Sequence, residues 1–327
     1  MSDLSIVIAS YETAPELRAC LRSIERSLAQ GLDLDLDVIV VDNGSRDESV
    51  ACALESALAP RVVASRRNRG FAAAMNVGLR LCRGRHVLLL NSDVEVDRAL
   101  LEGAVARLDA EEGVGVLGPA LVHSDGRAQR SVHAMPGLAT ELFSDRAVRW
   151  VSERLVAPSD RPEVGAARDV EAIRGAVFFL RAGCVEEVGL LDEGFFFFLE
   201  ETDYCGRVRE AGLRVVYCPS LVARHALGAS SKRRAPLATR IEYHRSLYRF
   251  LSRWRGPSIA RFVCALRAVR GILGLVLLSL PAVFSPRARA RLAQRYGLLL
   301  WHLRGCPSEP TLADALARVP LGGMGDG

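Results

Sequence analysis

The sequence lacks the glycine-rich phosphate loops of the commonest nucleotide-binding enzymes. No G-x-G-x-x-G follows the first predicted strand, and no G-x-x-x-x-G-K-[ST] occurs anywhere in the 327 residues. Because those loops bind diphosphates through backbone amides, their absence argues against a dinucleotide enzyme and against a P-loop NTPase. A diphosphate bound by this chain would have to be neutralised in another way.

Signals for export, disulfides and structural zinc are also missing. Residues 1–20 lack a charged start, a continuous apolar stretch and a small-residue cleavage site, so we expect no signal peptide. The eight cysteines are scattered without a C-x-x-C pair, and most have apolar neighbours. This pattern favours reduced core thiols in a cytoplasmic protein over a disulfide framework or a zinc site.

Acidic residues are nearly absent from one region of the chain. Residues 224–304 contain 17 arginines or lysines and a single acid, Glu242. Such a stretch suits an anionic surface, either a membrane or a nucleic acid. Lys232 is the only lysine of the chain, so a general preference for arginine is an alternative explanation of the basic patch. That preference does not explain the missing acids.

The first 120 residues alternate apolar runs with helical patterns, which is typical of parallel βαβ units. The runs consist of unbroken Val, Ile and Leu, as expected for strands covered on both faces. The sequence therefore predicts a largely parallel sheet sandwiched by helices. Strands are predicted at 4–9, 37–42, 61–65, 86–91 and 114–118, with helices at 15–29, 46–58 and 71–82, and a further strand at 214–219.

Polar residues follow four of these strands, at the edge of the sheet where α/β proteins bind ligands. A purely structural loop could carry any residue, so the coincidence indicates a binding site. The residues at the strand ends are Ser10, Tyr11 and Glu12, then Asp42, Asn43, Gly44 and Ser45, then Asn68, Arg69 and Gly70, and finally Asn91, Ser92 and Asp93.

Three of these side chains have a specific chemistry and an alternative structural role. Asp93 is a natural ligand for Mg²⁺ or Mn²⁺ that bridges donor phosphates, or else it caps the helix that starts near Asp97. Asp42 can accept a hydrogen bond from a nucleobase, or it forms an Asx turn with the following Asn-Gly. Arg69 contacts phosphate or is a solvated loop arginine.

Acidic side chains also follow an aromatic run, in GFFFFLEETDYCGRVREAG (194–212). Partial burial beside phenylalanines raises a carboxylate pKa toward the range of a general base, which makes the three acids Glu200, Glu201 and Asp203 catalytic candidates. The alternative is an ordinary acidic helix start, favoured by the helix dipole. His225 follows the predicted strand 214–219. It is either a metal ligand or a surface histidine. Because no other ligand is near it in the sequence, the local pattern favours a surface histidine.

Taken in order, the segments resemble family 2 glycosyltransferases of the GT-A fold, and most of all their rhamnosyltransferase-like branch. The matching pieces span residues 4–231 and are SIVIASYE, VIVVDNGSRDES, RNRGFAAAMNVGL, LLLNSDVEV, the segment from GAVFFLRAG to YCGRVREAG, and HALGASS. Two positions depart from the family pattern. Asn91 replaces a frequent Asp, as is common in this branch, and Glu201 stands where the base is usually Asp.

The resemblance implies an inverting, metal-dependent glycosyltransferase with a GT-A-type α/β fold. It assigns Asp93 and His225 to the metal, Mg²⁺ or Mn²⁺, and Glu201 to the catalytic base, with Asp203 as a rival. It implies a dTDP- or UDP-sugar donor, with rhamnose as one candidate sugar, and a glycan or lipid-linked acceptor in cell-surface polysaccharide synthesis. The nucleotide-binding candidates are Ser10, Tyr11, Glu12, Asp42, Asn68, Arg69, Asn91 and Ser92.

The predicted domains are a catalytic domain over 1–225 and a basic helical region over 226–320. Within the first, 1–120 binds nucleotide and 121–225 binds acceptor; residues 321–327 form a disordered tail. The uncharged run 271–284 is shorter than the roughly 20 residues that span a bilayer, and Pro281 interrupts it. We therefore expect a partly amphipathic helix on an anionic inner membrane surface, flanked by arginines, rather than a nucleic-acid partner. The alternatives are a helix packed on the catalytic domain and a partner-binding face.

Two other functions remain open at this stage. A sugar-nucleotide-forming nucleotidyltransferase also uses an α/β sheet and a metal, but it should have a Gly- and Lys/Arg-rich loop after the first strand. SIVIASYETAPEL has no such loop. A non-catalytic module that binds sugar nucleotide, or an anionic surface through the arginine-rich region, is compatible with the altered acidic motif. Metal-dependent turnover of a donor separates it from an enzyme.

Overall fold

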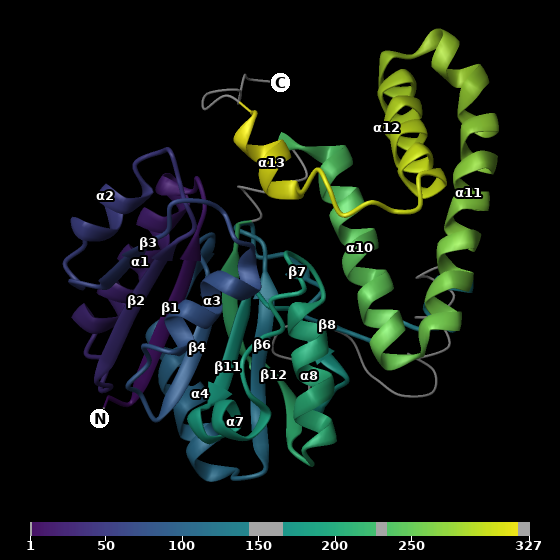
Figure 1. The fold of residues 1–327 in the computed structure, drawn as a ribbon. Helices are drawn as coiled ribbons and strands as arrows, with labels where there is room; N and C mark the ends of the chain where they lie inside the picture. The colour runs from purple at the N-terminus through teal and green to yellow at the C-terminus, as the bar shows by residue number, and fades with distance from the viewer. Residues whose placement is uncertain (1, 144–165, 227–233, 320–327) are drawn as a thin grey trace. The chain divides into compact units, whose positions relative to one another are not determined.

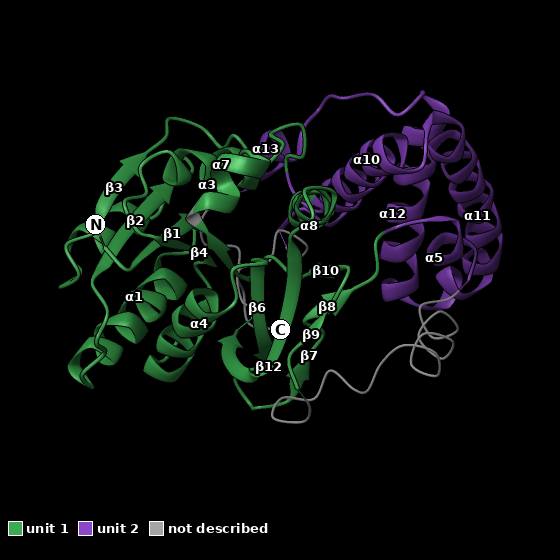
Figure 2. Ribbon diagram, turned by 90° about the horizontal axis from the view of Figure 1, so that it is seen from below, with its two compact units in different colours: residues 1–135, 152–196, 200–229 green, residues 136–151, 197–199, 230–327 purple. Residues whose placement is uncertain are grey.

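The structure is a computed structural model that describes residues 2–143, 166–226 and 234–319. It divides into two compact units (Figure 2). Unit 1 comprises residues 1–135, 152–196 and 200–229, and unit 2 comprises 136–151, 197–199 and 230–327. The predicted disordered tail at 321–327 and most of the HALGASS segment lie outside the described residues.

Unit 1 is an α/β unit built on one ten-stranded sheet (Figure 1). The strand order is β3-β2-β1-β4-β11-β6-β12-β5, with β7 beside β6 and β9 beside β12, and β8 and β10 form a separate pair. The strands are β1 (Leu4–Ser10), β2 (Leu36–Asp42), β3 (Arg61–Ala64), β4 (His86–Asn91), β5 (Val94–Glu95), β6 (Val114–Val122), β7 (Ala128–Gln129), β8 (Val132–His133), β9 (Arg168–Asp169), β10 (Ala172–Ile173), β11 (Val177–Arg181) and β12 (Arg214–His225).

Helices cover both faces of this sheet, as the unbroken apolar strands predict. One face carries α1, α2 and α4, and the other carries α3, α7 and α8 (Figure 2). Each face has its own buried cluster, because alternate residues of a strand point to opposite sides. The helices of this unit are α1 (Ala14–Ala29), α2 (Ser49–Leu54), α3 (Phe71–Leu79), α4 (Arg98–Ala110), α7 (Ala182–Val188) and α8 (Glu200–Glu210).

The sheet is largely parallel but mixed, since β11 runs antiparallel between β4 and β6. Several elements differ in length from their predictions; β6 runs four residues further than predicted, to Val122, and α3 ends at Leu79. Helix α2 begins at Ser49, after Asp47, whose carboxylate accepts hydrogen bonds from the Ser49 backbone and hydroxyl. Strand β12 continues past Pro219 to His225, because an irregularity between Cys218 and Val222 accommodates the proline without ending the strand.

Unit 2 is helical. Its described helices are α5 (Leu138–Leu142), α10 (Pro236–Trp254), α11 (Pro257–Phe284), α12 (Pro286–Leu303) and α13 (Leu312–Ala317). The prediction that Pro281 interrupts the apolar helix is wrong, because α11 runs through it to Phe284. Pro281 has no N–H to donate to the carbonyl of Leu277, so the helix continues through it with one intrahelical hydrogen bond fewer. Arg287, Arg289 and Arg291 belong to the next helix, α12.

Helix α11 exposes much of its apolar surface within unit 2. Among the described residues it is the one helix long and apolar enough to cross a bilayer, with a mean hydropathy of 2.0 over 18 residues, of which 11% are buried. The uncharged run 271–284, taken alone, therefore underestimated the length of this apolar helix. Leu277 and Phe284 are 76% and 80% exposed. Length and composition suit both a helix that crosses a membrane and one that lies in its surface.

Candidate functional site

The ends of three parallel strands bring the predicted nucleotide-binding residues together. Strand β1 pairs with β2 on one side and β4 on the other, so that Ser10 is aligned with Asp42, and Ala9 with Asn91. The next residue after Asn91, Ser92, is linked to Ser10 through Thr13. The Thr13 hydroxyl lies 3.0 Å from the Ser10 hydroxyl and 2.9 Å from that of Ser92. This buried hydroxyl network fixes the loops that follow β1 and β4.

Glu12 is held in an unusual backbone conformation beside this network. Its φ of 53° lies in the left-handed region, which a non-glycine residue adopts at some cost in free energy. Its backbone N–H donates to the Ser45 hydroxyl at 2.8 Å, and its carboxylate accepts from Arg46 Nε at 2.6 Å. Tyr11, the residue before it, is partly exposed. The loop after β1 is thus fixed against the loop after β2.

Asp42 forms the Asx turn considered for it and leaves its second carboxylate oxygen unpaired. Its Oδ2 atom accepts hydrogen bonds from the backbone N–H groups of Gly44 at 3.1 Å and Ser45 at 2.9 Å, which is the Asx turn. Its Oδ1 atom is buried and has no hydrogen-bond partner within the described ranges. Because an unpaired buried acceptor is costly, this oxygen is suited to accept a hydrogen bond from a ligand N–H.

Asn43, one of the strand-end residues to which sequence analysis assigned no specific role, holds the loop after β3. Its side-chain amide donates to Asn68 Oδ1 at 3.0 Å and to the Gly70 carbonyl at 2.9 Å, and its Oδ1 accepts from the Arg69 backbone N–H at 2.9 Å. The Arg69 side chain is 54% exposed and lies 3.5 Å from Glu193. The backbone of the RNRG segment is therefore fixed, while the Arg69 guanidinium remains accessible to solvent.

Gly70 lies where the loop after β3 meets the aromatic run before α8. Its φ is 93°, and a Cβ atom built there would lie 2.5 Å from the carbonyl oxygen of Phe196. The next residue, Phe71, donates its backbone N–H to the same carbonyl at 2.8 Å. No larger residue fits at position 70 without displacing one of the two segments.

The two predicted metal ligands face each other. Strand β5 pairs antiparallel with the end of β12, which aligns His225 with Val94, the residue after Asp93. The His225 Nε2 atom lies 3.3 Å from Asp93 Oδ1. His225 is buried, so the surface interpretation of this residue is wrong. The helix-capping alternative for Asp93 is also wrong, because Asp97 caps α4 by accepting from the Leu100 backbone N–H at 2.9 Å.

Gln129 on β7 orients the His225 ring. Its Nε2 atom lies 2.6 Å from the His225 carbonyl, which can only accept, so the side-chain nitrogen must be the donor. Its Oε1 atom therefore accepts from His225 Nδ1 at 3.0 Å, and the lone pair of a neutral His225 is left on Nε2, toward Asp93. Two acceptors that face each other in this way are suited to share a cation, and a hydrogen-bonded second nitrogen is typical of metal-binding histidines.

Glu201 lies in the first turn of α8, with its carboxylate next to Gly175. A Cβ atom built on Gly175 would lie 3.2 Å from Glu201 Cβ. The Oε2 atom of Glu201 is buried and has no hydrogen-bond partner in the part of the chain that the structure describes. Burial raises the pKa of this carboxyl, and backbone amides and the charge of Arg174 lower it by less. A raised pKa and an unpaired oxygen are suited to a general base.

Arg174 and His133 complete the surroundings of Glu201, and sequence analysis identified neither. Burial lowers the pKa of Arg174, while the charge of Glu201 raises it. His133 Nε2 lies 2.8 Å from the Thr202 hydroxyl, and burial lowers the pKa of this histidine to about 4. His133 is therefore neutral near pH 7, and Arg174 is the cation beside the base.

Asp203 has a structural environment. Its side chain is fully buried and forms an ion pair with Arg207 one turn later, at 3.0 Å between Oδ2 and Nε. The same guanidinium donates to the carbonyls of Val188 and Leu190 at 2.9 Å. Asp203 thus holds the arginine that joins α8 to the end of α7.

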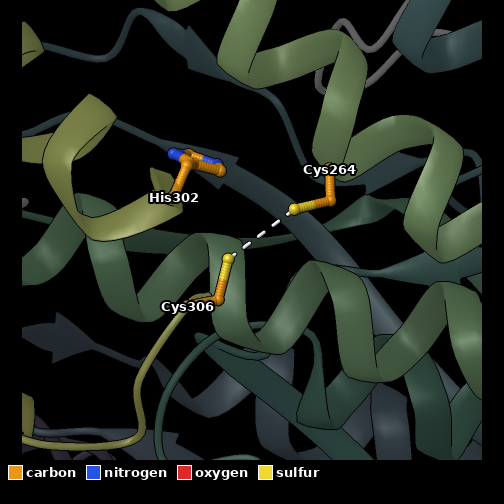
Figure 3. Close-up of side chains that lie close together, drawn as sticks. All are labelled: Cys264, His302 and Cys306. Carbon is orange, nitrogen blue, oxygen red and sulfur yellow. Dashed lines mark hydrogen bonds between the residues drawn. The ribbon is translucent and has the colours of Figure 1, made fainter. Parts of the chain in front are cut away.

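A separate group of possible metal ligands lies in unit 2. The Sγ atoms of Cys264 and Cys306 are 3.6 Å apart and point toward each other, with His302 nearby (Figure 3). The His302 ring is already engaged, since Nδ1 lies 2.8 Å from the Leu298 carbonyl and Nε2 lies 2.8 Å from the Tyr248 hydroxyl. All eight cysteines of the chain are free thiols, and five of them are buried, as the sequence predicted.

Comparison with known proteins identifies relatives of this chain. Residues 5–157 match the family model described as glycosyl transferase family 2. The chain is 28% identical to the N-acetylglucosaminyl-diphospho-decaprenol L-rhamnosyltransferase of Mycobacterium tuberculosis over 280 residues, which cover 78% of this chain and 87% of the relative. It is 34% identical to the succinoglycan biosynthesis protein ExoO of Rhizobium meliloti over 160 residues, 46% of this chain and 44% of that protein.

A solved structure shares the fold. The mannosyltransferase of Pyrobaculum calidifontis, in complex with GDP-Man and Mn²⁺, superposes with a TM-score of 0.56 at 17% sequence identity. The match covers 94% of this chain and 88% of that one. At this identity the likeness concerns the fold, and it agrees with the predicted GT-A architecture.

Proposed function

This chain belongs to glycosyl transferase family 2, in its rhamnosyltransferase-like branch, and we propose that it transfers a sugar from a dTDP- or UDP-sugar to a hydroxyl of a glycan or lipid-linked acceptor. The observation that carries the proposal is the pair Asp93 and His225, whose facing acceptor atoms lie beside the buried strand ends. The Mycobacterium relative, named for N-acetylglucosaminyl-diphospho-decaprenol, supports a lipid-linked acceptor in cell-surface polysaccharide synthesis.

In this proposal the strand ends of β1, β2 and β4 hold the donor nucleotide. Asp42 Oδ1 accepts a hydrogen bond from a nucleobase N–H, because it is the buried oxygen that the Asx turn leaves unpaired. The hydroxyls of Ser10 and Ser92, with Tyr11 and Glu12, position the nucleoside. Further contacts come from Asn68, Arg69 and Asn91 on the neighbouring loops.

Asp93 and His225 fit a divalent metal, Mg²⁺ or Mn²⁺. The donor set is one carboxylate oxygen and one imidazole nitrogen, which Gln129 orients through the opposite ring nitrogen. When bound, such an ion neutralises charge on the departing nucleoside diphosphate. The Mn²⁺ complex of the Pyrobaculum mannosyltransferase, which has the same fold, supports this assignment.

Glu201 is the proposed base of a single displacement. Its carboxylate takes the proton from the acceptor hydroxyl, whose oxygen forms a bond to the anomeric carbon. The bond from that carbon to the donor phosphate breaks, and the nucleoside diphosphate leaves with the electron pair. Attack opposite the leaving group inverts the anomeric configuration. Asp203 is less suited to this role, because its carboxylate is buried and paired with Arg207.

The experiment is a screen of UDP-, GDP- and dTDP-sugars by ligand-observed NMR, with and without Mn²⁺, followed by a transfer assay on a polyprenyl-diphosphate-linked acceptor. We expect metal-dependent transfer from a dTDP- or UDP-sugar. Pyrophosphate release from a nucleoside triphosphate and a sugar phosphate would instead indicate a nucleotidyltransferase. Donor binding without turnover would indicate a non-catalytic module. Family membership favours the transferase over both.

We further propose that residues 226–320 hold the protein peripherally on the inner face of the cell membrane, while residues 1–225 carry the catalytic domain, divided near residue 120 into a nucleotide-binding and an acceptor-binding part. The support is the basic composition of the first region and the exposed apolar face of α11. Such a helix binds an anionic bilayer by burying apolar side chains while nearby arginines contact lipid headgroups.

Replacing both Leu277 and Phe284 by Gln should reduce binding to anionic liposomes by at least about 10-fold, because each side chain contributes roughly 1.5–3 kcal/mol when fully buried in an apolar phase. Folding should be unaffected, since both side chains are largely exposed. A flotation assay measures the bound fraction. The matched control is Leu54→Gln, a 66% exposed leucine at the end of α2 in unit 1, which should float like the wild type. Wild-type protein that stays soluble in this assay contradicts the proposal.

A further inference from the structure

A pocket in unit 2 is lined by four arginines from three helices. Arg240 comes from α10, Arg267 and Arg270 from α11, and Arg295 from α12. Its volume is about 360 Å³, and Glu141 of α5 is the acid in its lining. Burial lowers the pKa of His244, which also lines the pocket, to about 2, so this side chain adds no positive charge near pH 7. The pocket is therefore strongly cationic.

The single acid compensates one of the four arginines. Glu141 Oε2 lies 2.8 Å from Arg267 Nε and 2.7 Å from Arg267 Nη2, a paired contact through two guanidinium nitrogens. No carboxylate of the described residues lies within 4.0 Å of the guanidinium of Arg240, Arg270 or Arg295. Three positive charges in one pocket thus lack an acidic partner in this part of the chain, and mutual repulsion makes such a cluster unfavourable unless an anion binds.

One of the uncompensated arginines, Arg270, is held by hydrogen bonds, and a second, Arg295, lies against a neighbouring helix. Arg270 donates to the carbonyls of Glu141 and Leu142 at the end of α5. Arg295 lies across the backbone of α11 at Gly274, where a Cβ atom would come within 1.8 Å of its Nη1 atom. The absence of a side chain at Gly274 therefore makes room for the Arg295 guanidinium. An arginine that is held by hydrogen bonds, as Arg270 is, binds phosphate oxygens with little further loss of conformational entropy.

Most of the exposed apolar surface of α11 follows the pocket arginines. Arg267, Arg270 and Gly271 line the pocket, and apart from Phe262 and Val269 the large exposed apolar side chains of the same helix lie between Ile272 and Phe284. At 1.5 Å per residue this stretch is roughly 20 Å long, comparable with one leaflet of a bilayer. A cationic pocket continuous with an apolar helix face matches an amphiphile that has an anionic head and a hydrocarbon tail.

We propose that this pocket binds the diphosphate of a polyprenyl-diphosphate-linked acceptor, with Arg240, Arg270 and Arg295 on its phosphate oxygens. The inference rests on the proposed function, because the acceptor class comes from there. A diphosphate carries negative charge on two adjacent groups, which suits several solvent-accessible arginines in one pocket better than the single charge of a phospholipid headgroup does. The hydrocarbon tail lies along the exposed face of α11.

The test uses the full chain and neutral phosphatidylcholine vesicles that contain farnesyl diphosphate. Parallel arms use vesicles with phosphatidylglycerol at equal total charge, and inorganic pyrophosphate in solution. We expect the wild type to bind the farnesyl diphosphate vesicles at least about 10-fold more tightly than the phosphatidylglycerol vesicles, because charge-assisted hydrogen bonds to the second phosphate add to the affinity. Equal binding to both vesicles would overturn the proposal. So would equal affinity for inorganic pyrophosphate, which would assign the pocket to a soluble anion.

Two variants examine the pocket itself. Arg295→Gln removes one uncompensated charge, and Gly274→Ala keeps every charge but displaces the Arg295 guanidinium. Each should weaken binding to farnesyl diphosphate vesicles by about 10-fold. The matched control is Arg291→Gln, an exposed arginine of the same helix that does not line the pocket, which should leave binding unchanged. If Arg291→Gln weakens binding as much as Arg295→Gln does, attraction by net charge explains the effect and the proposal fails.

Binding of the sugar nucleotide separates this proposal from the proposed function. Both pocket variants should retain wild-type donor affinity, because the nucleotide-binding residues lie in unit 1. Donor turnover with no preference for farnesyl diphosphate would overturn the pocket and leave the glycosyltransferase assignment intact. Preference for farnesyl diphosphate without any sugar transfer would overturn the proposed function instead.

Discussion

Glu201→Gln should lower the rate of sugar transfer by about 10²–10⁴-fold while donor affinity stays nearly unchanged, which is the usual effect of removing a positioned general base. The substitution keeps the size of the side chain and removes its ability to take a proton. Burial raises the pKa of Glu201. As the pH falls, its carboxylate is therefore protonated, and unable to act as a base, at a higher pH than an ordinary glutamate is. In the wild type, activity should therefore rise with pH through this raised pKa, and that rise should disappear in the variant.

Two further variants show whether the effect belongs to the base. Glu201→Asp should retain part of the activity, because it keeps a carboxylate but shortens its reach. Asp203→Asn should instead lower the free energy of unfolding by about 3 kcal/mol, since it leaves Arg207 without its buried partner. Transfer per folded molecule should change little in that variant. Full activity of Glu201→Gln, together with loss of activity in folded Asp203→Asn, would reassign the base to Asp203.

Asp93→Ala should reduce transfer by at least about 10³-fold, because the carboxylate is the anionic member of the proposed metal site and the neighbouring Asn91 adds no charge. Initial rates at several Mn²⁺ concentrations measure the effect. The matched control is Asp97→Ala, four residues later, which removes the α4 cap at a cost of about 1 kcal/mol in stability and should leave transfer per folded molecule intact. Activity that persists in Asp93→Ala, or in the wild type with EDTA, contradicts the metal assignment.

Gln129→Leu provides a graded version of the same test. It removes the acceptor that holds the Nδ1 proton of His225 and leaves both proposed ligands in place. Metal affinity should fall by about 10–100-fold, with activity restored at higher Mn²⁺ concentration. Restoration distinguishes loss of ligand orientation from loss of a ligand, because excess metal should not rescue Asp93→Ala.

The grouping of the residues at the strand ends could be predicted because one rule applies to all of these strands. Unbroken apolar runs locate the strands, and parallel pairing places their carboxyl ends at one edge, so Ser10, Asp42 and Asn91 could be grouped from the sequence alone. His225 required more than this rule. It reaches Asp93 because β12 passes Pro219 through an irregularity and then pairs with the two-residue strand β5. Local patterns treat that proline as the end of a strand.

Gln129 was beyond sequence reasoning for a different reason. It lies on a two-residue strand, too short for any periodicity, and its partner is 96 positions later in the chain. Arg174 is similar, since nothing near it in the sequence indicates that it neighbours Glu201. The unpaired Oδ1 atom of Asp42 could not be predicted either. The sequence presents the Asx turn and a ligand contact as alternatives, whereas the structure places the turn on Oδ2 and leaves Oδ1 without a partner among the described residues.

The contact of Gly70 with the Phe196 carbonyl constrains how this enzyme can be re-engineered. The loop after β3 and the aromatic run before α8 are fitted to each other with no space for a methyl group. A chimera that takes one of these loops from another transferase, in order to change donor choice, would place a foreign backbone against a surface shaped for the native one. Residues 66–71 and 194–196 would therefore have to be exchanged together in such a chimera, because each segment fits only a partner of matching shape.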